Sequence, residues 1–484
     1  MSLTDLRGWL AQVQEIGELV EIAGVDSQAE MGTLTEITQH EPYCPAILFT
    51  EIPGVSSGRI LVNTLGTVRR MGATVGIQGP DSTLGFVRSW KEWIKGRIPI
   101  APRPVKDGPV LEHVQRDEQV DLHQFPAPLW HEQDGGKYLG TAAVTISRDP
   151  SEGWINLGVY RIMLHGRNEI SCTMSPGKHG RIHRDQTLES GEPWRVAISF
   201  GHHPIFFLVG SLELPPKLSE YDVIGGMLGE PVEVITGETS GLPIPAWSEM
   251  TIEGICTGKD RRPEGPFGEF TGYYASGTRP EYIIKVDRIY HRTNPILLGN
   301  PPLRPPSENA FWQSLVRSAI LWDELEKAGV PDIQGVWRMP ASGSRMINVV
   351  SIKQRYPGHA RQVGHLAAQV RSGAYIGRYV IVVDEDIDPT DTDQVLWALS
   401  TRSDPESSID IVGRCWSGPL DPIIPKNQKG FSSRAVIDAC RPYEWKDEFP
   451  PVVGASPEET ARVRAKYAQI LGLRANAKKG VLDE

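Results

Sequence analysis

The 484-residue chain has few cysteines, no excess of basic residues and no long apolar segment. Its five cysteines are scattered without paired spacing, which argues against a disulfide framework or a zinc site and is typical of a reducing cytosol. The formal net charge of −10 argues against the basic face that nucleic-acid binding needs. No run of about 18 apolar residues could span a membrane, and the first residues contain no apolar signal core. We therefore expect a cytoplasmic protein without nucleic-acid or membrane partners.

Glycine and proline, by contrast, are frequent, with 49 and 39 residues. At about 150 residues per domain, the length predicts two to four domains. Residues 1–112 have the pattern of an α/β region, and the proline-rich segment 99–109 is a candidate linker. Residues 113–305 are rich in short strands, as in a sandwich or barrel. Residues 306–484 alternate strands and helices, as in βαβ units, and a terminal helix is expected from the cap Ser456. The tail 475–484 is polar and is expected to fray.

Two carboxylates lie on either side of a tight turn in the segment 263–274. Glu264 and Glu269 flank Gly265, Pro266 and Gly268. Proline fixes φ and glycines admit backbone angles that other residues avoid, so the segment is predicted to be a rigid bend that holds both carboxylates near one point. In a site without water, desolvation and like charge would raise and separate their pKa values. A surface turn with two solvated glutamates is the plainer alternative.

The segment 154–164 is predicted to be a strand because it is rich in β-branched and aromatic residues. Arg161 is a candidate for binding a carboxylate or a phosphate. Asn156 and Arg161 are separated by an odd number of positions and would point to opposite faces of an unbroken strand. They could serve one site only if Gly158 permits a bulge or if one residue lies beyond the strand. A solvated arginine on an edge strand is the alternative.

Further polar groups lie in two other segments of the middle region. Residues 175–183 are expected to form a loop that carries His179 and His183, and Ser219 is expected to cap a helix that has Glu220 in its first turn and Asp222 at capping-box spacing. Together with Asn156, such nitrogen and oxygen donors suit Mn²⁺ or Mg²⁺ better than a thiolate-binding metal. Solvated loop histidines and an acidic residue that favours a helix N-terminus are the simpler explanations. The spacing does not show that these donors converge.

The chain resembles the UbiD family of prenylated-flavin-dependent (de)carboxylases over nearly its whole length. The glutamate bend, followed by Thr271-Gly-Tyr-Tyr274, is the most specific match. The other matching segments follow in the family's order: Asn156 to Arg161, His202-His-Pro204, Phe206-Phe207, Leu218-Ser-Glu-Tyr221, Val382-Val-Asp384, Asp386-Ile-Asp388, Trp397-Ala-Leu399, Thr401-Arg402 and Ile437-Asp-Ala439. The resemblance implies an α/β N-terminal region, a central split β-barrel of the flavin-reductase type that holds the flavin, and a C-terminal α/β oligomerisation domain.

The resemblance also implies the site residues. Arg161, Glu264 and Glu269 match the family's catalytic network, and Asn156, His179 and Glu220 match the ligands of a divalent ion, usually Mn²⁺, that binds the cofactor phosphate. His183 is the alternative ligand to His179. A K⁺ ion is expected near the backbone carbonyls of Val209 to Leu212 and Glu220. Arg378 falls where the family often has a lysine near the cofactor.

The implied reaction is a reversible, non-oxidative decarboxylation of an α,β-unsaturated or (hetero)aromatic carboxylic acid through a covalent adduct with prenylated FMN. Side chains offer no sink for the electrons that CO₂ leaves behind, so a cofactor must supply one. Arg161 would orient the substrate carboxylate or the flavin edge, Glu264 would hold Arg161, and Glu269 would donate the proton as general acid. The substrate wall is expected around Trp416 to Pro422.

The resemblance further implies a flavin prenyltransferase as cofactor supplier and a homodimer or larger homo-oligomer, since dimers and hexamers both occur in the family. Two other functions stay open at this point. One is an FMN-dependent reductase built on the same barrel. The other is a non-catalytic, metal-stabilised subunit.

Overall fold

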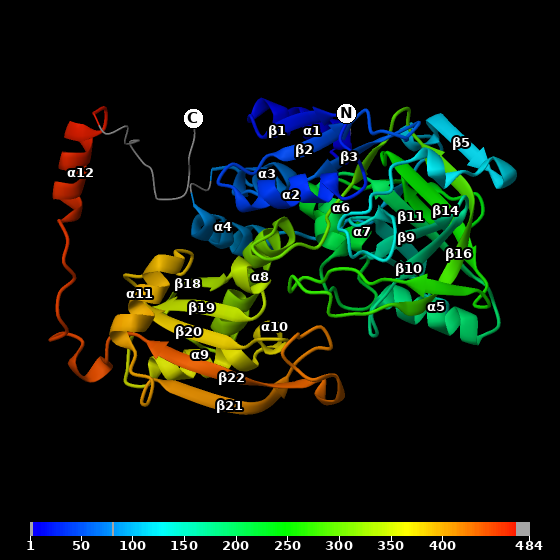
Figure 1. The fold of residues 1–484 in the computed structure, drawn as a ribbon. Helices are drawn as coiled ribbons and strands as arrows, with labels where there is room; N and C mark the ends of the chain where they lie inside the picture. Colours follow the sequence, from blue (N-terminus) through cyan, green and yellow to red (C-terminus); the bar gives the residue numbers. More distant parts are fainter. Residues whose placement is uncertain (1–2, 80–81, 471–484) are drawn as a thin grey trace.

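The computed structural model describes residues 3–79 and 82–470. The fold is mixed α/β, with four sheets among the described residues (Figure 1). An N-terminal sheet with its helices, a large curled sheet and a C-terminal sheet make up most of the molecule. Among the described residues, no helix combines the length and apolar character needed to cross a bilayer.

The N-terminal sheet has the strand order β1 (Leu19–Ala23), β2 (Ala46–Thr50), β3 (Arg59–Val62) and β17 (Ile296–Leu298). Four helices accompany it: α1 (Leu6–Glu15), α2 (Glu30–His40), α3 (Val68–Val75) and α4 (Thr83–Lys95). Asp5 caps α1 by accepting a hydrogen bond from the Arg7 backbone N–H. Because β17 comes from a distant part of the chain and pairs with β3, this sheet joins the N-terminal segment to the end of the middle region.

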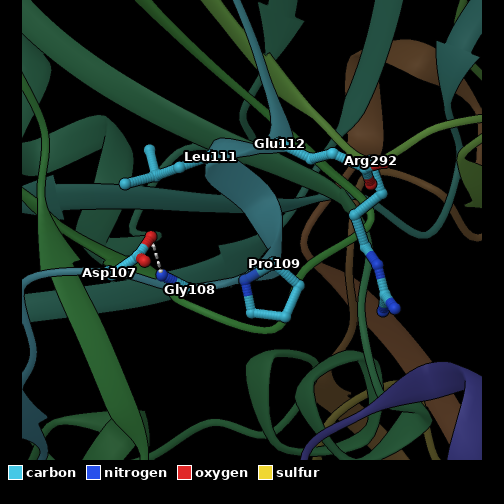
Figure 2. Close-up of a pocket in the computed structure, with 6 residues that line it drawn as sticks. All are labelled: Asp107, Gly108, Pro109, Leu111, Glu112 and Arg292. Atoms are coloured by element: carbon cyan, nitrogen blue, oxygen red, sulfur yellow. Dashed lines mark hydrogen bonds between the residues drawn. The ribbon is translucent and has the colours of Figure 1, made fainter.

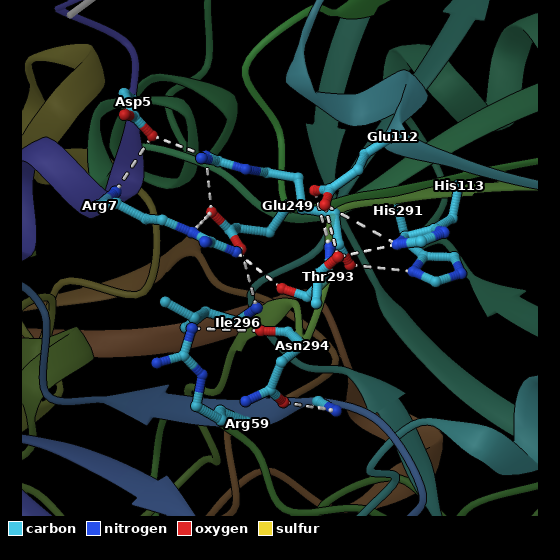
Figure 3. A network of polar contacts seen from close by, with 12 residues as sticks. Asp5, Arg7, Arg59, Glu112, His113, Glu249, His291, Thr293, Asn294 and Ile296 are labelled. Carbon is cyan, nitrogen blue, oxygen red and sulfur yellow. Dashed lines mark hydrogen bonds and ion pairs between the residues drawn. The ribbon is translucent and has the colours of Figure 1, made fainter.

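A buried ion-pair network attaches α1 to the curled sheet (Figure 3). Arg7 donates to both Glu249 carboxylate oxygens at 2.9 Å, and Arg292 donates to Asp5 and to Glu249 at 2.9 Å each. The Glu249 side chain is completely buried. Since a buried carboxylate is tolerated only with its charge compensated, the two arginines fix the N-terminal helix against the ends of two strands.

The curled sheet has the order β6 (Tyr138–Gly140), β9 (Arg161–Gly166), β10 (Glu169–Thr173), β16 (Arg279–His291), β14 (Met250–Cys256), β11 (Trp194–Gly201), β7 (Val144–Arg148) and β8 (Ile155–Val159). Two short strands, β5 (His113–Arg116) and β15 (Arg261–Glu264), also pair with β16. The chain passes from β8, at one end of this order, to β9, near the other end, through the single residue Tyr160. A flat sheet could not accommodate this step, so the sheet must curl until its ends meet.

The same step corrects the prediction of one strand over 154–164. Two strands meet at Tyr160, with different neighbours: β8 pairs with β7, while β9 pairs with β6 and β10. The odd spacing of Asn156 and Arg161 therefore does not place them on opposite faces of one strand.

Three helices pack around the curled sheet: α5 (His179–Glu189), α6 (Pro204–Gly210) and α7 (Glu220–Leu228). The prediction of a loop that includes His179 and His183 is wrong, because both lie on α5. The turn ends earlier, at Gly177, whose φ is 84°. Ser219 precedes α7 as expected, but its hydroxyl makes no cap hydrogen bond, so the capping box predicted with Asp222 does not form.

The proline-rich segment 99–109 is more than a linker, because it contains the strand β4 (Arg103–Pro104). This strand pairs with β12 (Glu233–Thr236), which also pairs with β13 (Pro243–Pro245). The three strands form a small separate sheet.

The C-terminal sheet has the order β18 (Ile333–Arg338), β19 (Ile347–Ile352), β20 (Tyr379–Asp384), β22 (Phe431–Ala439) and β21 (Ile409–Trp416). Its central pairs are parallel and its two edge strands are antiparallel. The helices are α8 (Glu308–Lys327), α9 (His359–Gln369), α10 (Arg371–Ala374), α11 (Thr392–Arg402) and α12 (Pro457–Tyr467). Helix α8 packs against β18 and α4, and α12 stands away from the body (Figure 1). Ser456 caps α12 as predicted; the tail 475–484 lies outside the described residues.

Candidate active site

The glutamate bend begins where β15 ends, at Glu264. Gly265 has φ of 80°, a left-handed conformation that favours glycine. Gly268 does not adopt such a φ, contrary to expectation; instead, a Cβ atom there would lie 3.0 Å from the Pro302 ring. The Gly265 carbonyl accepts a hydrogen bond from the Thr278 hydroxyl at 3.1 Å. These contacts hold the bend in one conformation.

Arg161, the first residue of β9, lies between the two glutamates. Its Nε and Nη2 donate to the two carboxylate oxygens of Glu264 at 2.8 Å each, in a bidentate pair. Its Nη1 lies 3.5 Å from Glu269 Oε1. The structure thus brings together the three residues of the expected catalytic network, two from the glutamate bend and one from β9.

Burial differs across this network and governs its electrostatics. The Glu264 side chain is fully buried, whereas those of Arg161 and Glu269 are 12% and 17% exposed. Burial alone would raise the pKa of Glu264, but hydrogen bonds and charge from Arg161 outweigh it and hold the pKa below its usual value. Burial raises the pKa of Glu269, and the more distant Arg161 offsets this only in part. One carboxylate is therefore stabilised as the anion and the other in its protonated form.

Two further side chains complete the network, and the sequence analysis missed both. The Tyr138 hydroxyl donates to Glu264 Oε1 at 2.9 Å, and the Ser276 hydroxyl donates to Glu269 Oε1 at 2.8 Å. Ser276 lies seven positions after Glu269, so its closeness to the bend was a usable signal. Tyr138 is 126 positions from Glu264 and carries no local signal.

A second group of polar residues lies on β8 and at the start of α7. Glu220 Oε2 accepts the backbone N–H of Leu157 at 2.7 Å, which places this carboxylate beside Asn156. Glu220 is buried, and burial raises its pKa to about 7. Within residues 3–79 and 82–470, no arginine, lysine or histidine forms an ion pair with it. The Asn156 amide nitrogen is buried without a hydrogen-bond partner. A buried carboxylate without a counter-charge fits a cation site, to which Asn156 could add its amide oxygen.

The two histidines of α5 differ in their burial and in their side-chain contacts. His183 is buried, its Nδ1 lies 3.0 Å from the Ser147 hydroxyl and its Nε2 lies 3.6 Å from Asp149. Burial lowers the pKa of His183 to about 4. His179 is half-buried, and the contact found for its ring is an edge-on one with Trp154. Helix α5 thus leaves His179 the more available ligand.

Arg378 and Leu212 are not linked to this network by any contact found in the described residues. Arg378 pairs with Asp421 at 2.5 Å, and Asp421 also accepts the Ser417 hydroxyl. Leu212 follows α6, and its backbone N–H donates to the Val209 carbonyl.

A pocket of about 480 Å³ lies away from the network, between the short helical turn at Pro109 and the end of β16 (Figure 2). Its lining includes Asp107, Glu112, Leu111 and Arg292. The Arg292 guanidinium is already held by Asp5 and Glu249. The pocket therefore offers no free arginine charge to a ligand.

Comparisons with known proteins cover the whole length of the chain. Three parts of the 3-octaprenyl-4-hydroxybenzoate carboxy-lyase UbiD match in order: the N-terminal domain over residues 10–88, the Rift-related domain over 103–305 and the C-terminal domain over 310–439. The chain is 33% identical to a phenolic acid decarboxylase of Bacillus subtilis over 91% of its own length and 93% of the relative's. It is 32% identical to a pyrrole-2-carboxylic acid decarboxylase of Pseudomonas aeruginosa, covering 93% of each protein.

The solved structures agree with these relatives. The UbiD-class enzyme HmfF of Pelotomaculum thermopropionicum, in complex with FMN, superposes with a TM-score of 0.84 at 26% identity, covering 96% of this chain and 100% of that one. An evolved dimeric form of HmfF in complex with prFMN superposes with a TM-score of 0.79 at 26% identity, covering 94% and 98%.

Fold and full-length matches together define an enzyme of the carboxy-lyase class, a decarboxylase. The chain belongs to the UbiD family.

Proposed function

We propose that this enzyme uses prenylated FMN to decarboxylate a (hetero)aromatic or α,β-unsaturated carboxylic acid, reversibly and without net oxidation. The observation that carries the proposal is that Glu264 and Glu269 contact Arg161 in different ways. Glu264 takes two of its nitrogens in a buried bidentate pair, while Glu269 faces the third at 3.5 Å and favours its protonated form. The site therefore contains both a fixed cation and a carboxyl group whose pKa is raised by burial, which suits carboxylate binding followed by protonation.

Each residue of the network has one role in this proposal. Arg161 Nη1 orients the substrate carboxylate or the flavin edge, because its other nitrogens are committed to Glu264. Glu264 stays ionised and fixes the guanidinium. The protonated carboxyl group of Glu269 donates its proton to the carbon that has lost CO₂. Ser276 holds that carboxyl group in place by its hydrogen bond.

The chain's own residues fit the cofactor's anionic end. Asn156, His179 and Glu220 would hold a divalent ion, Mn²⁺ in our proposal, which would neutralise the flavin phosphate. Carbonyls of Val209 to Leu212, at the end of α6, would contribute to a K⁺ site together with Glu220. Support comes from the buried Glu220 carboxylate, whose charge no ion pair among the described residues compensates. When bound, prenylated FMN would supply the electron sink that side chains lack. A contact of Arg378 with the cofactor stays a prediction.

Several broader predictions belong to the same proposal. We propose that the curled sheet is a split β-barrel of the flavin-reductase type, with domains at 1–112, 113–305 and 306–484. We further propose a cytoplasmic homo-oligomer that receives its cofactor from a flavin prenyltransferase. The detached position of α12 is consistent with a role in assembly.

The test is to co-express the chain with a flavin prenyltransferase, measure the mass of the bound cofactor and screen unsaturated and aromatic acids for CO₂ release. We expect FMN with a prenyl-sized mass excess, and CO₂ from at least one acid. Unmodified FMN with NADH oxidation and no CO₂ release would contradict the proposal.

A further inference from the structure

Three arginines on the C-terminal side of the glutamate bend form what we call the arginine cluster: Arg317 on α8, Arg338 at the end of β18, and Arg345 in the turn before β19. Arg338 Nη2 donates to the Arg345 carbonyl at 3.2 Å. Arg317 Nε donates to Gln313 Oε1 at 3.1 Å. The Nε atoms of Arg338 and Arg345 are buried without a hydrogen-bond partner.

The cluster lacks the compensating carboxylate that the buried Arg70 and Arg402 have. Arg70 pairs with Glu18 at 2.7 Å and Arg402 pairs with Asp384 at 2.9 Å. In the parts of the chain that the structure describes, no carboxylate lies within ion-pair distance of a cluster member. Glu213 attracts Arg317 and Arg345 from a longer range, and it is paired with Lys178 at 3.3 Å.

The electrostatic strain is visible in the pKa values of the cluster. Burial, reinforced by repulsion from Arg345, lowers the pKa of Arg338 to about 9. Burial, together with repulsion from Arg345 and Arg338, also lowers that of Arg317. Like charges held together without counter-ions destabilise a protein, so a ligand that supplied negative charge would relieve this strain.

The cluster adjoins the candidate active site. The Arg345 guanidinium lies 5.1 Å from the centre of the Phe270 ring, and Phe270 directly follows Glu269. On its other side Arg345 lies 5.6 Å from the Tyr375 ring, which contacts Trp416 with ring centres 4.8 Å apart. Arg345 thus connects the catalytic bend to the aromatic residues of the expected substrate wall.

We propose that Arg317 and Arg345 form a second anion-binding subsite, distinct from Arg161, that accepts an oxyanion group. The proposal rests on the proposed function, because it places the subsite beside the reacting centre. A guanidinium suits a carboxylate or a phosphate equally well, since both present oxygens that match its fork of N–H donors. The oxyanion therefore belongs either to the cofactor, as its phosphate, or to the substrate, as an acidic group in addition to the carboxylate that is lost.

A polar series along α8 supports the subsite. Gln313 donates to Asn309 at 2.8 Å and accepts from Arg317, and the Ser344 hydroxyl lies 3.4 Å from the same Gln313 oxygen. These contacts fix Arg317 by its Nε while providing no negative charge. The arrangement orients the guanidinium and leaves its charge for a ligand.

The experiment compares Arg317→Gln and Arg345→Gln with the parent protein and with Arg355→Gln, a control that removes an exposed arginine paired with Asp332. One arm titrates the cofactor-free, Mn²⁺-supplied protein with FMN and with riboflavin. The other titrates the cofactor-loaded protein with terephthalate and with benzoate, which differ by one carboxylate. In each arm the preference is the ratio of the affinities for the more charged and the less charged ligand. We expect this ratio to fall at least tenfold in one of the two arms for each cluster variant, and to stay unchanged for the control.

The arm that responds identifies the source: the FMN pair indicates the cofactor phosphate, and the terephthalate pair indicates a substrate group. Unchanged preferences in both arms would overturn the subsite, even if CO₂ release and the cofactor mass bear out the proposed function. The FMN arm can be read even if no acid is decarboxylated, so the two failures are distinguishable. Melting temperature gives a second readout. Removing a strained charge should raise the melting temperature of ligand-free Arg317→Gln, whereas a purely structural arginine would lower it.

Discussion

The hydrogen bond from Tyr138 to Glu264 offers a sharp test of how the network is held. The change Tyr138→Phe removes one hydroxyl from a fully buried site and leaves the ring in place. A hydrogen bond to a charged group contributes about 1.5–3 kcal/mol. If losing this bond leaves the Glu264–Arg161 pair less firmly positioned and raises the activation free energy by only the lower figure, kcat/KM falls roughly tenfold.

The fold contains a matched control for this change. The Tyr290 hydroxyl donates to Glu253 at 2.5 Å, also in a buried position, at the end of β16 that is remote from its pairing with β15 and the glutamate bend. The same hydroxyl accepts the Glu238 backbone N–H at 3.1 Å, so Tyr290→Phe should destabilise the protein at least as much as Tyr138→Phe without lowering turnover. The assay is CO₂ release by both cofactor-loaded variants, with thermal unfolding of each to compare stability.

Three outcomes are informative. A drop in kcat/KM for Tyr138→Phe alone supports a positioning role for Tyr138. Parent-level activity in both variants would refute the reasoning, because it would mean that Arg161 and Glu264 need no third partner. Equal loss in both would assign the effect to stability and not to the network.

Two more predictions concern the acid and the cation site. Turnover requires protonated Glu269, so kcat/KM should fall as pH rises through the raised pKa of this residue. The Ser276 hydrogen bond lowers that pKa, so Ser276→Ala should move the alkaline limb of the pH–rate profile to higher pH. An unmoved limb would contradict the assignment. Glu220→Gln should abolish binding of Mn²⁺, measured by metal analysis after dialysis. The same change should raise the melting temperature of the metal-free protein, because the amide removes a buried, unpaired charge. Mn²⁺ retained at the parent level would count against the site.

Local chemistry made parts of the site predictable. The Gly-Pro-Phe-Gly segment sets a bend within six residues, so the nearness of Glu264 and Glu269 could be inferred without knowledge of the fold. The same holds for α12, whose Ser-Pro start has a local capping signal that the structure reproduces. Family resemblance, and not spacing, brought Arg161 into the same group.

Other features depend on long-range structure and left no local pattern. The break at Tyr160 follows from the curling of the sheet, because β8 and β9 belong to opposite ends of its strand order. Glycine and proline before α5 favour a loop, and the buried residues of the helix, Gly180, His183 and Arg184, give no apolar periodicity that would predict it. Tyr138 reaches Glu264 only through the pairing of β6 with β9.

The central claim is that Glu269 donates the proton that replaces CO₂. The direct measurement is CO₂ release by Glu269→Gln after loading with prenylated FMN, with the amount and mass of the bound cofactor determined in the same sample. The account predicts full cofactor occupancy and turnover reduced to background, because the amide has no acidic proton to give. Decarboxylation at the parent rate by the loaded variant would contradict it.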